Sequence, residues 1–190
     1  GCMAASLAAC GGSASSAATD ASSAASTEAA TSEATEATGT SANGFTVQLG
    51  PNPETLDPAL NSAIDGANTI ITTFEPLLLI DENNDVVPGQ AELPEVSDDG
   101  LTWTFTMKDG LKWSDGSDLT AKDFEYSFKR LACPDTAAPY AETVVGMIDG
   151  YQDAIGNPDA DGNTTTDPDW DALNVVASED GKDLTITLSY

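Results

Sequence analysis

The segment Lys112–Arg130 reads KWSDGSDLTAKDFEYSFKR, and it predicts the end of a strand, then a turn, then a capped helix. Ser114-Asp115-Gly116 has the composition of a tight turn, in which glycine readily takes a positive φ. Thr120 is a favourable N-cap residue, and Asp123 three positions later completes a pair like a capping box. The apolar residues that follow have the spacing of one helical face: Phe124, Phe128 and Leu131. The helix is therefore predicted to pack its apolar side on a sheet.

Outward from this segment, the sequence predicts both strands and helices. Leu101–Met107 alternates apolar residues with threonines, as a half-buried strand does, and Leu111–Trp113 is predicted to pair back on it. Leu173–Ala177 and Leu184–Leu188 are predicted to form a second hairpin. The other expected elements are strands at Phe45–Leu49 and Leu77–Ile80, and helices at Asn61–Phe74 and Tyr140–Ile155.

The composition excludes some classes of function. The 190 residues, enough for one domain with a core, include 6 basic and 32 acidic side chains, a net charge of −26. Phosphates would be repelled, which argues against nucleic acid as a partner, and the acidity is typical of a well-solvated surface. Histidine, the commonest general base and metal ligand, is absent from the sequence. The cysteines are Cys2, Cys10 and Cys133; if the chain matures at Cys10, Cys133 is the only free thiol left, so we expect no disulfide framework and a buried apolar role for Cys133.

The first ten residues end in Leu7-Ala8-Ala9-Cys10, followed by Gly11-Gly12. This pattern resembles a bacterial lipobox, in which the cysteine is lipidated and becomes the new N-terminus. A secretory signal also has a cationic region and a longer apolar region, and neither precedes Cys10. We interpret residues 1–10 as a truncated lipoprotein signal; a chance match is the alternative.

Residues 11–43 are expected to be a disordered linker. They are dominated by alanine, serine, threonine and glutamate, and contain no aromatic or branched aliphatic residue. Such a segment cannot bury enough apolar surface to offset the entropy of ordering it. As a random coil, about 30 residues span about 30 Å on average, a suitable tether between an anchor and a folded body.

Four further segments precede Lys112–Arg130 along the chain: TLDP at 55–58, FEPL at 74–77, VPGQAE at 87–92 and VSDDGLTWTF at 96–105. Together with the first segment they resemble the signature of the family 5 bacterial extracellular solute-binding proteins. These are the oligopeptide- and dipeptide-binding proteins of ATP-driven importers. One departure is Gln90, which stands where the family has an apolar residue.

The resemblance implies an α/β fold, the N-terminal lobe portion of a two-lobed, periplasmic-binding-protein-like fold of type II, preceded by the tether. Residues 44–190 would form this portion, with 44–74 and 173–190 in one sheet and 75–172 as an inserted subdomain. Members of the family are considerably longer, so we expect the chain to be a fragment.

The resemblance also implies a function, the extracellular capture of peptides or similar small solutes for import, without catalysis, metal or cofactor. The implied partners are a peptide and the permease subunits of an ABC transporter. The implied location is the outer face of the cytoplasmic membrane, periplasmic or extracellular, with a lipid on Cys10. The cleft residues carried over from the family are Phe74, Glu75, Pro76 and Leu77. They would lend main-chain groups to the ligand, with Glu75 close to a cationic part of it.

Other interpretations remain open or are excluded. A lipid-tethered surface module without a ligand fits the lipobox, the linker and the acidic body. A hydrolase would need a nucleophile–base pair, which this sequence does not offer. Asp159–Asn163 invites a calcium interpretation, but an EF-hand loop starting there would need Gly at Thr164 and Glu at Trp170. We therefore expect a polar surface loop there.

Overall fold

The computed structural model describes residues 50–190, which belong to a compact unit that spans Thr46–Tyr190. The predicted strand Phe45–Leu49, the predicted lipidation site Cys10 and the predicted linker 11–43 lie outside the described residues. They stay predictions.

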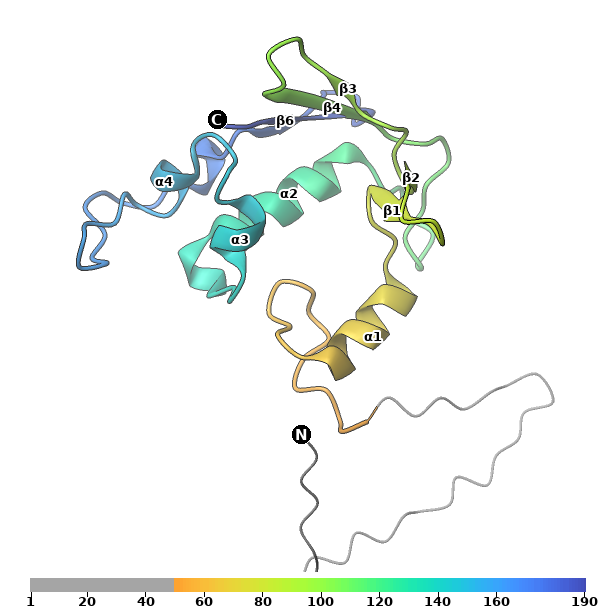
Figure 1. Cartoon of the computed structure of the whole chain (residues 1–190), viewed down its shortest axis with the longest axis horizontal. Coiled ribbons are helices and arrows are strands. Elements are labelled where there is room, and N and C mark those ends of the chain that lie inside the picture. Colours follow the sequence, from red (N-terminus) through yellow and green to blue (C-terminus); the bar gives the residue numbers. More distant parts are fainter. Residues whose placement is uncertain (1–49) are drawn as a thin grey trace, which may run out of the picture. The chain divides into compact units, whose positions relative to one another are not determined.

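A four-stranded antiparallel sheet with the order β3-β4-β6-β5 forms the body of this unit (Figure 1). Its strands are β3 (Glu95–Val96), β4 (Thr102–Thr106), β5 (Val175–Ala177) and β6 (Asp183–Thr187). Phe105 of β4 stands opposite Leu184 of β6, so their side chains share one face of the sheet. Both side chains are buried, which confirms the predicted alternation in β4 and the predicted β5–β6 hairpin.

The helix predicted from the opening segment is α2 (Ala121–Ala132), and it lies along the buried face of the sheet (Figure 1). The apolar face of α2 packs against the core as expected, through Phe124, Phe128 and Leu131. The predicted cap is confirmed, because the carboxylate of Asp123 accepts the Thr120 N–H (2.8 Å) and the Thr120 hydroxyl (3.0 Å).

A two-stranded sheet joins β1 (Leu78–Ile80) to β2 (Val86–Pro88). Its turn is organised by Asp81, whose carboxylate accepts the N–H groups of Asn83 (2.8 Å) and Asp85 (2.9 Å). A side chain that satisfies two main-chain donors explains why this acidic stretch forms a tight loop.

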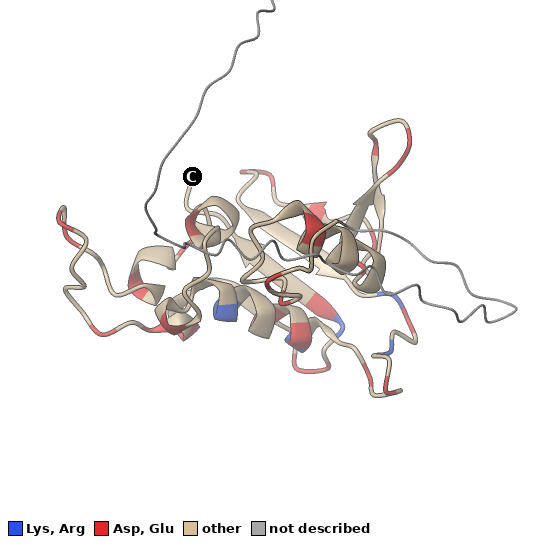
Figure 2. Cartoon of the chain, turned by 90° about the horizontal axis from the view of Figure 1, so that it is seen from below, with Lys and Arg blue, Asp and Glu red and all other residues tan. Residues whose placement is uncertain are grey.

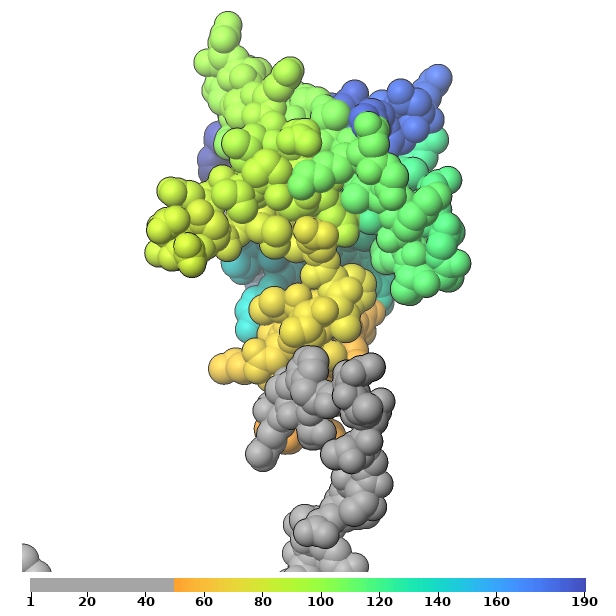
Figure 3. All heavy atoms as spheres, turned by 90° about the vertical axis from the view of Figure 1, so that its right-hand side faces the viewer, coloured from red at the N-terminus to blue at the C-terminus, as the bar shows by residue number. Residues whose placement is uncertain are grey.

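Helix α1 (Ile64–Thr73) lies within the predicted range, but the described residues leave two of its large apolar side chains uncovered. The side chains of Ile64 and Ile71 are 80% and 75% exposed. Figure 3 shows α1, in yellow, at the surface of this unit.

The single helix predicted at Tyr140–Ile155 is wrong. The structure has two short helices there, α3 (Ala141–Val145) and α4 (Tyr151–Ala154). Helix α3 is already capped at Gly146, and Gly150 directly before α4 has φ of 81°, a left-handed conformation that a continuous helix cannot contain. The 3-10 helices η1 (Pro134–Thr136) and η2 (Trp170–Ala172) complete the elements.

Two predicted pairings also differ from the structure. Leu111–Trp113 does not pair with β4; instead Trp113 N–H donates to Ser117 O (2.9 Å) and Leu119 N–H donates to Leu111 O (3.2 Å). Both edges of β4 are already taken by β3 and β6, so no edge is left for this segment.

The division of the lobe is the other correction. β6, at the end of the chain, pairs along its length with β4, so residues 75–172 are not a subdomain apart from the sheet of residues 173–190. The cause is the matched alternation of the two strands, which buries Phe105, Leu184 and Ile186 together.

The acidic residues are distributed along the described chain, in loops and turns as well as in helices (Figure 2). Within the described residues, no helix is both long enough and apolar enough to cross a bilayer.

Candidate functional site

The TLDP segment forms a turn organised by its own polar side chains. Thr55 Oγ1 accepts the Asp57 N–H (3.1 Å), and Asp57 Oδ1 accepts the Ala59 N–H (3.0 Å). The main-chain carbonyl of Asp57 accepts the N–H groups of Leu60 (3.1 Å) and Asn61 (3.0 Å). These bonds hold the Asp57 carboxylate in one orientation at the surface of the turn.

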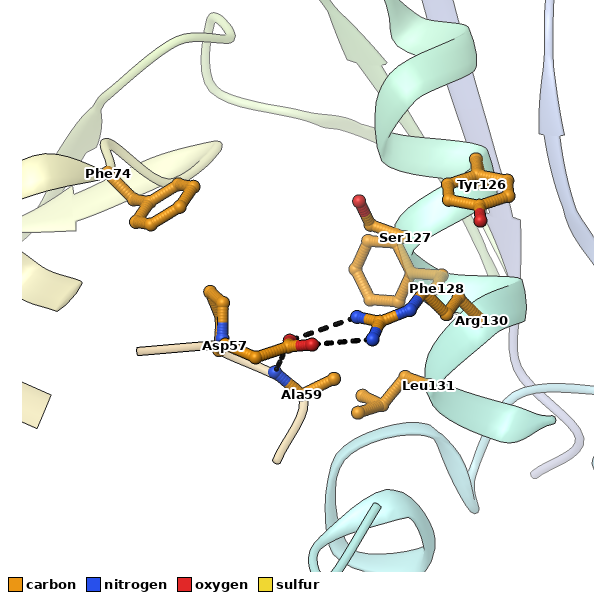
Figure 4. A pocket seen from close by; sticks show the side chains of 9 residues that line it. Asp57, Ala59, Phe74, Tyr126, Ser127, Phe128, Arg130 and Leu131 are labelled. Carbon is orange, nitrogen blue, oxygen red and sulfur yellow. Dashed lines mark hydrogen bonds and ion pairs between the residues drawn. The ribbon is translucent and has the colours of Figure 1, made fainter. Parts of the chain in front are cut away.

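Arg130, in the last turn of α2, faces that carboxylate and forms a two-pronged ion pair with it (Figure 4). Arg130 Nη1 lies 3.0 Å from Asp57 Oδ1, and Nη2 lies 2.5 Å from Oδ2. The hydrogen bonds from Arg130 hold the pKa of Asp57 below its ordinary value of 3.8. The pair therefore stabilises the fold above about pH 3.8 and is lost as the pH falls through the lowered pKa.

The FEPL segment begins where α1 ends. Phe74 is the C-cap residue of α1, with an extended backbone, and its N–H donates to Ile70 O (2.9 Å). Farther along, Pro76 O accepts the Gln90 N–H (3.0 Å), and Leu77 O accepts the N–H groups of Gly89 and Ala91 (3.1 Å each). The FEPL and VPGQAE segments are thus held together by main-chain hydrogen bonds.

Between the TLDP turn, Phe74 and α2 there is an open hollow of about 490 Å³ (Figure 4). Its lining comes from three of the segments singled out in the sequence: Asp57, Pro58, Ala59, Phe74, Tyr126, Ser127, Phe128, Arg130 and Leu131. The volume is in the range of small-molecule sites, and the lining combines apolar side chains with one ion pair.

Of the four predicted cleft residues, only Phe74 lines this hollow. Glu75 and Pro76 are exposed, and Leu77 is half-buried against the core. Within residues 50–190, the main-chain N–H and carbonyl of Glu75 have no hydrogen-bond partner. The carbonyl of Phe74 and the N–H of Leu77 also have no partner among these residues, so this stretch of FEPL main chain is free to pair with another extended strand.

Arg130 lines the hollow but was not predicted to be part of a site. The sequence signal that could have identified Arg130 is the scarcity of cations. The chain has only 6 basic residues and 32 acidic ones, so each basic residue has many possible acidic partners. Choosing Asp57 as its partner, 73 positions away, still requires the fold.

The Asp159–Asn163 loop is held by its first residue, because Asp159 Oδ1 accepts the N–H groups of Asp161 and Asn163 (2.9 Å each). Among the described residues, no group of three or more histidine, cysteine or carboxylate side chains is placed to hold a metal ion.

Comparison with known proteins gives these features a context. The family model for bacterial extracellular solute-binding proteins, family 5 Middle, matches residues 85–190, more than half of the chain. The chain belongs to this family. The matched part includes the opening segment and all four strands of the main sheet.

The family 5 relatives include proteins named for peptide binding. The periplasmic murein peptide-binding protein MppA of Escherichia coli is 42% identical over 89 residues, 47% of this chain and 16% of that protein. The periplasmic oligopeptide-binding protein OppA of Salmonella typhimurium is 40% identical over 107 residues, 56% of this chain and 20% of that protein.

Among solved structures, Haemophilus influenzae OppA in complex with the peptide RPPGFSPFR has a TM-score of 0.64 and 30% identity. The match covers 74% of this chain and 26% of that one. The predicted fold class is confirmed: the chain has the α/β fold of part of a two-lobed family 5 protein. It spans about a fifth of the length of the curated relatives.

Proposed function

We propose that the chain is part of the extracellular substrate-binding component of an ABC importer, and that this component captures peptides. The observation that carries the proposal is the main chain at Glu75, which has no hydrogen-bond partner within residues 50–190 and lies beside a segment fixed by Gly89, Gln90 and Ala91. An extended peptide could add to this short length of backbone as a strand adds to a sheet edge. Such binding captures a solute without covalent chemistry, so no catalytic role is proposed.

The exposed Glu75 side chain supplies the charge for recognition. In the proposed site it lies close to a cationic group of the peptide, such as its amino terminus. Glu75→Ala in the natural full-length protein is expected to weaken peptide binding by about tenfold, the effect of one charged contact. Because Glu75 is exposed, its replacement is expected to leave the melting temperature almost unchanged.

Isothermal titration calorimetry with a set of peptides, together with thermal unfolding of each variant, tests this. Glu82→Ala is a matched control, since Glu82 is also exposed but lies in the β1–β2 turn. Equal affinities for wild type and Glu75→Ala would remove Glu75 from the site. The absence of peptide binding by wild type would favour the ligand-free surface module.

We further propose that Cys10 carries a lipid that anchors the protein at the outer face of the cytoplasmic membrane, in the periplasm or outside the cell. The support is the sequence Leu7-Ala8-Ala9-Cys10-Gly11 ahead of a linker without large apolar residues. Mass spectrometry of the protein expressed with an intact signal is expected to show a diacylglyceryl group on Cys10. Cys10→Ser is expected to move the protein from the membrane to the soluble fraction. An unmodified Cys10 in the mature protein would refute the anchor.

A further inference from the structure

The TLDP turn and helix α1 form one closely packed piece at the start of the described chain. At the start of α1, the Cα of Gly66 comes so close to the TLDP region that an added Cβ would lie 2.0 Å from Asn61 Oδ1 and 2.9 Å from Thr55 O. The turn and the start of α1 are therefore packed closely against each other. Helix α1 in turn ends at Phe74, the first residue of the FEPL segment.

Little apolar packing holds this piece against the body. Ile64 and Ile71 of α1 are exposed, and Phe74 lines an open hollow instead of a closed core. The directed contact across the hollow is the ion pair of Asp57 with Arg130 (Figure 4). Both partners are preorganised: Arg130 by the helix that packs on the sheet, and Asp57 by the bonds of its own turn.

We propose that Asp57 and Arg130 are positioning residues that set where the Phe74–Leu77 segment lies relative to α2. The inference rests on the proposed function, in which this segment meets the peptide. The planar guanidinium bonds both carboxylate oxygens, so it fixes the orientation of the turn as well as its distance. The segment is then held at its start through α1 and at its end by Gly89, Gln90 and Ala91.

The side chains of Asp57 and Arg130 are 28% and 33% exposed, so the ion pair is expected to contribute little to the free energy of unfolding. Its expected effect is on the position of the TLDP turn and α1 relative to α2, which a distance measurement can report. Two nitroxide labels on the 190-residue chain, at Asn68→Cys on α1 and Val176→Cys on β5, report the distance between the piece and the body. Both positions are exposed, and the native cysteines are replaced by serine. Arg130→Gln and Asp57→Asn remove the pair, and the amide of the second variant can still accept the Ala59 N–H.

Double electron–electron resonance is expected to show a distance distribution about twice as wide in Arg130→Gln and Asp57→Asn as in the wild type, because a charge-assisted fork is lost. Arg130→Lys is expected to give a distribution of intermediate width, narrower than that of Arg130→Gln but wider than that of the wild type. Lysine keeps the positive charge, but its ammonium group cannot bond both carboxylate oxygens as the planar guanidinium does. The matched control is Lys129→Gln, one residue away on α2, which breaks the ion pairs with Glu125 and Asp171 and leaves Asp57 untouched. It is expected to keep the wild-type width.

The same variants in the full-length protein connect geometry to binding. Arg130→Gln is expected to weaken peptide binding by about tenfold, while Lys129→Gln leaves it unchanged. An unchanged distance distribution in Arg130→Gln would overturn the inference. So would equal widening in Lys129→Gln, which would show a general loosening of α2. Because the distance measurement needs no peptide, failure of the proposed function would not produce either result.

Discussion

The 190-residue chain alone is expected to bind the peptide RPPGFSPFR at least about a thousandfold more weakly than intact Haemophilus influenzae OppA, a difference of about 4 kcal/mol. The chain matches 26% of that protein, and the hollow beside Phe74 is open. A two-lobed binding protein gains affinity by closing around its ligand, which buries most of the ligand surface. A part of one lobe offers only one wall, so most of that burial is missing.

Isothermal titration calorimetry on both proteins measures the difference, and a chimera shows its cause. In the chimera, residues 50–190 of this chain replace the matching part of the Haemophilus influenzae protein. Once circular dichroism has shown that the chimera folds, it is expected to recover binding to within about tenfold of the intact relative. Tight binding by the lone chain would refute the requirement for a second lobe. A folded chimera without binding would show that this chain's wall does not accept peptides.

The elements that local sequence determines could be predicted well. The cap at Thr120, the apolar face of α2 and the β5–β6 hairpin depend on neighbouring residues, and the structure has all of them. The break between α3 and α4 could not be predicted from periodicity, because Val144, Ile148 and Tyr151 continue a helical spacing across it.

Pairings between distant segments were harder to predict. Nothing in Asp183–Thr187 indicates that β4 is its neighbour. The pairing of β4 with β6 depends on the edge of each strand that remains free once β3 has paired with β4 and β5 with β6. The candidate site has the same limit. The motifs identified Asp57 and Phe74, whereas the contact between Asp57 and Arg130 spans 73 positions and appears only in three dimensions.

The core of the main sheet is where a single substitution is expected to cost most stability. Leu184 lies on β6, which has a neighbour on each side, and its side chain is 0% exposed. It stands opposite Phe105 of β4 and Ala177 of β5, on the face that α2 covers. With partners on every side, the site cannot collapse around a smaller residue. Leu184→Ala is therefore expected to lower the free energy of unfolding by about 3 kcal/mol.

Urea unfolding of the 190-residue chain, followed by circular dichroism, measures this loss as a lower midpoint with an unchanged slope. Leu93→Ala makes the same chemical change at a side chain that is 54% exposed, and it is expected to cost less than about 1 kcal/mol. Similar losses for the two variants would mean that β6 is not the centre of the core. A loss confined to Leu184→Ala would show that the strand at the end of the chain completes the fold, because β4 and α2 depend on it for their packing.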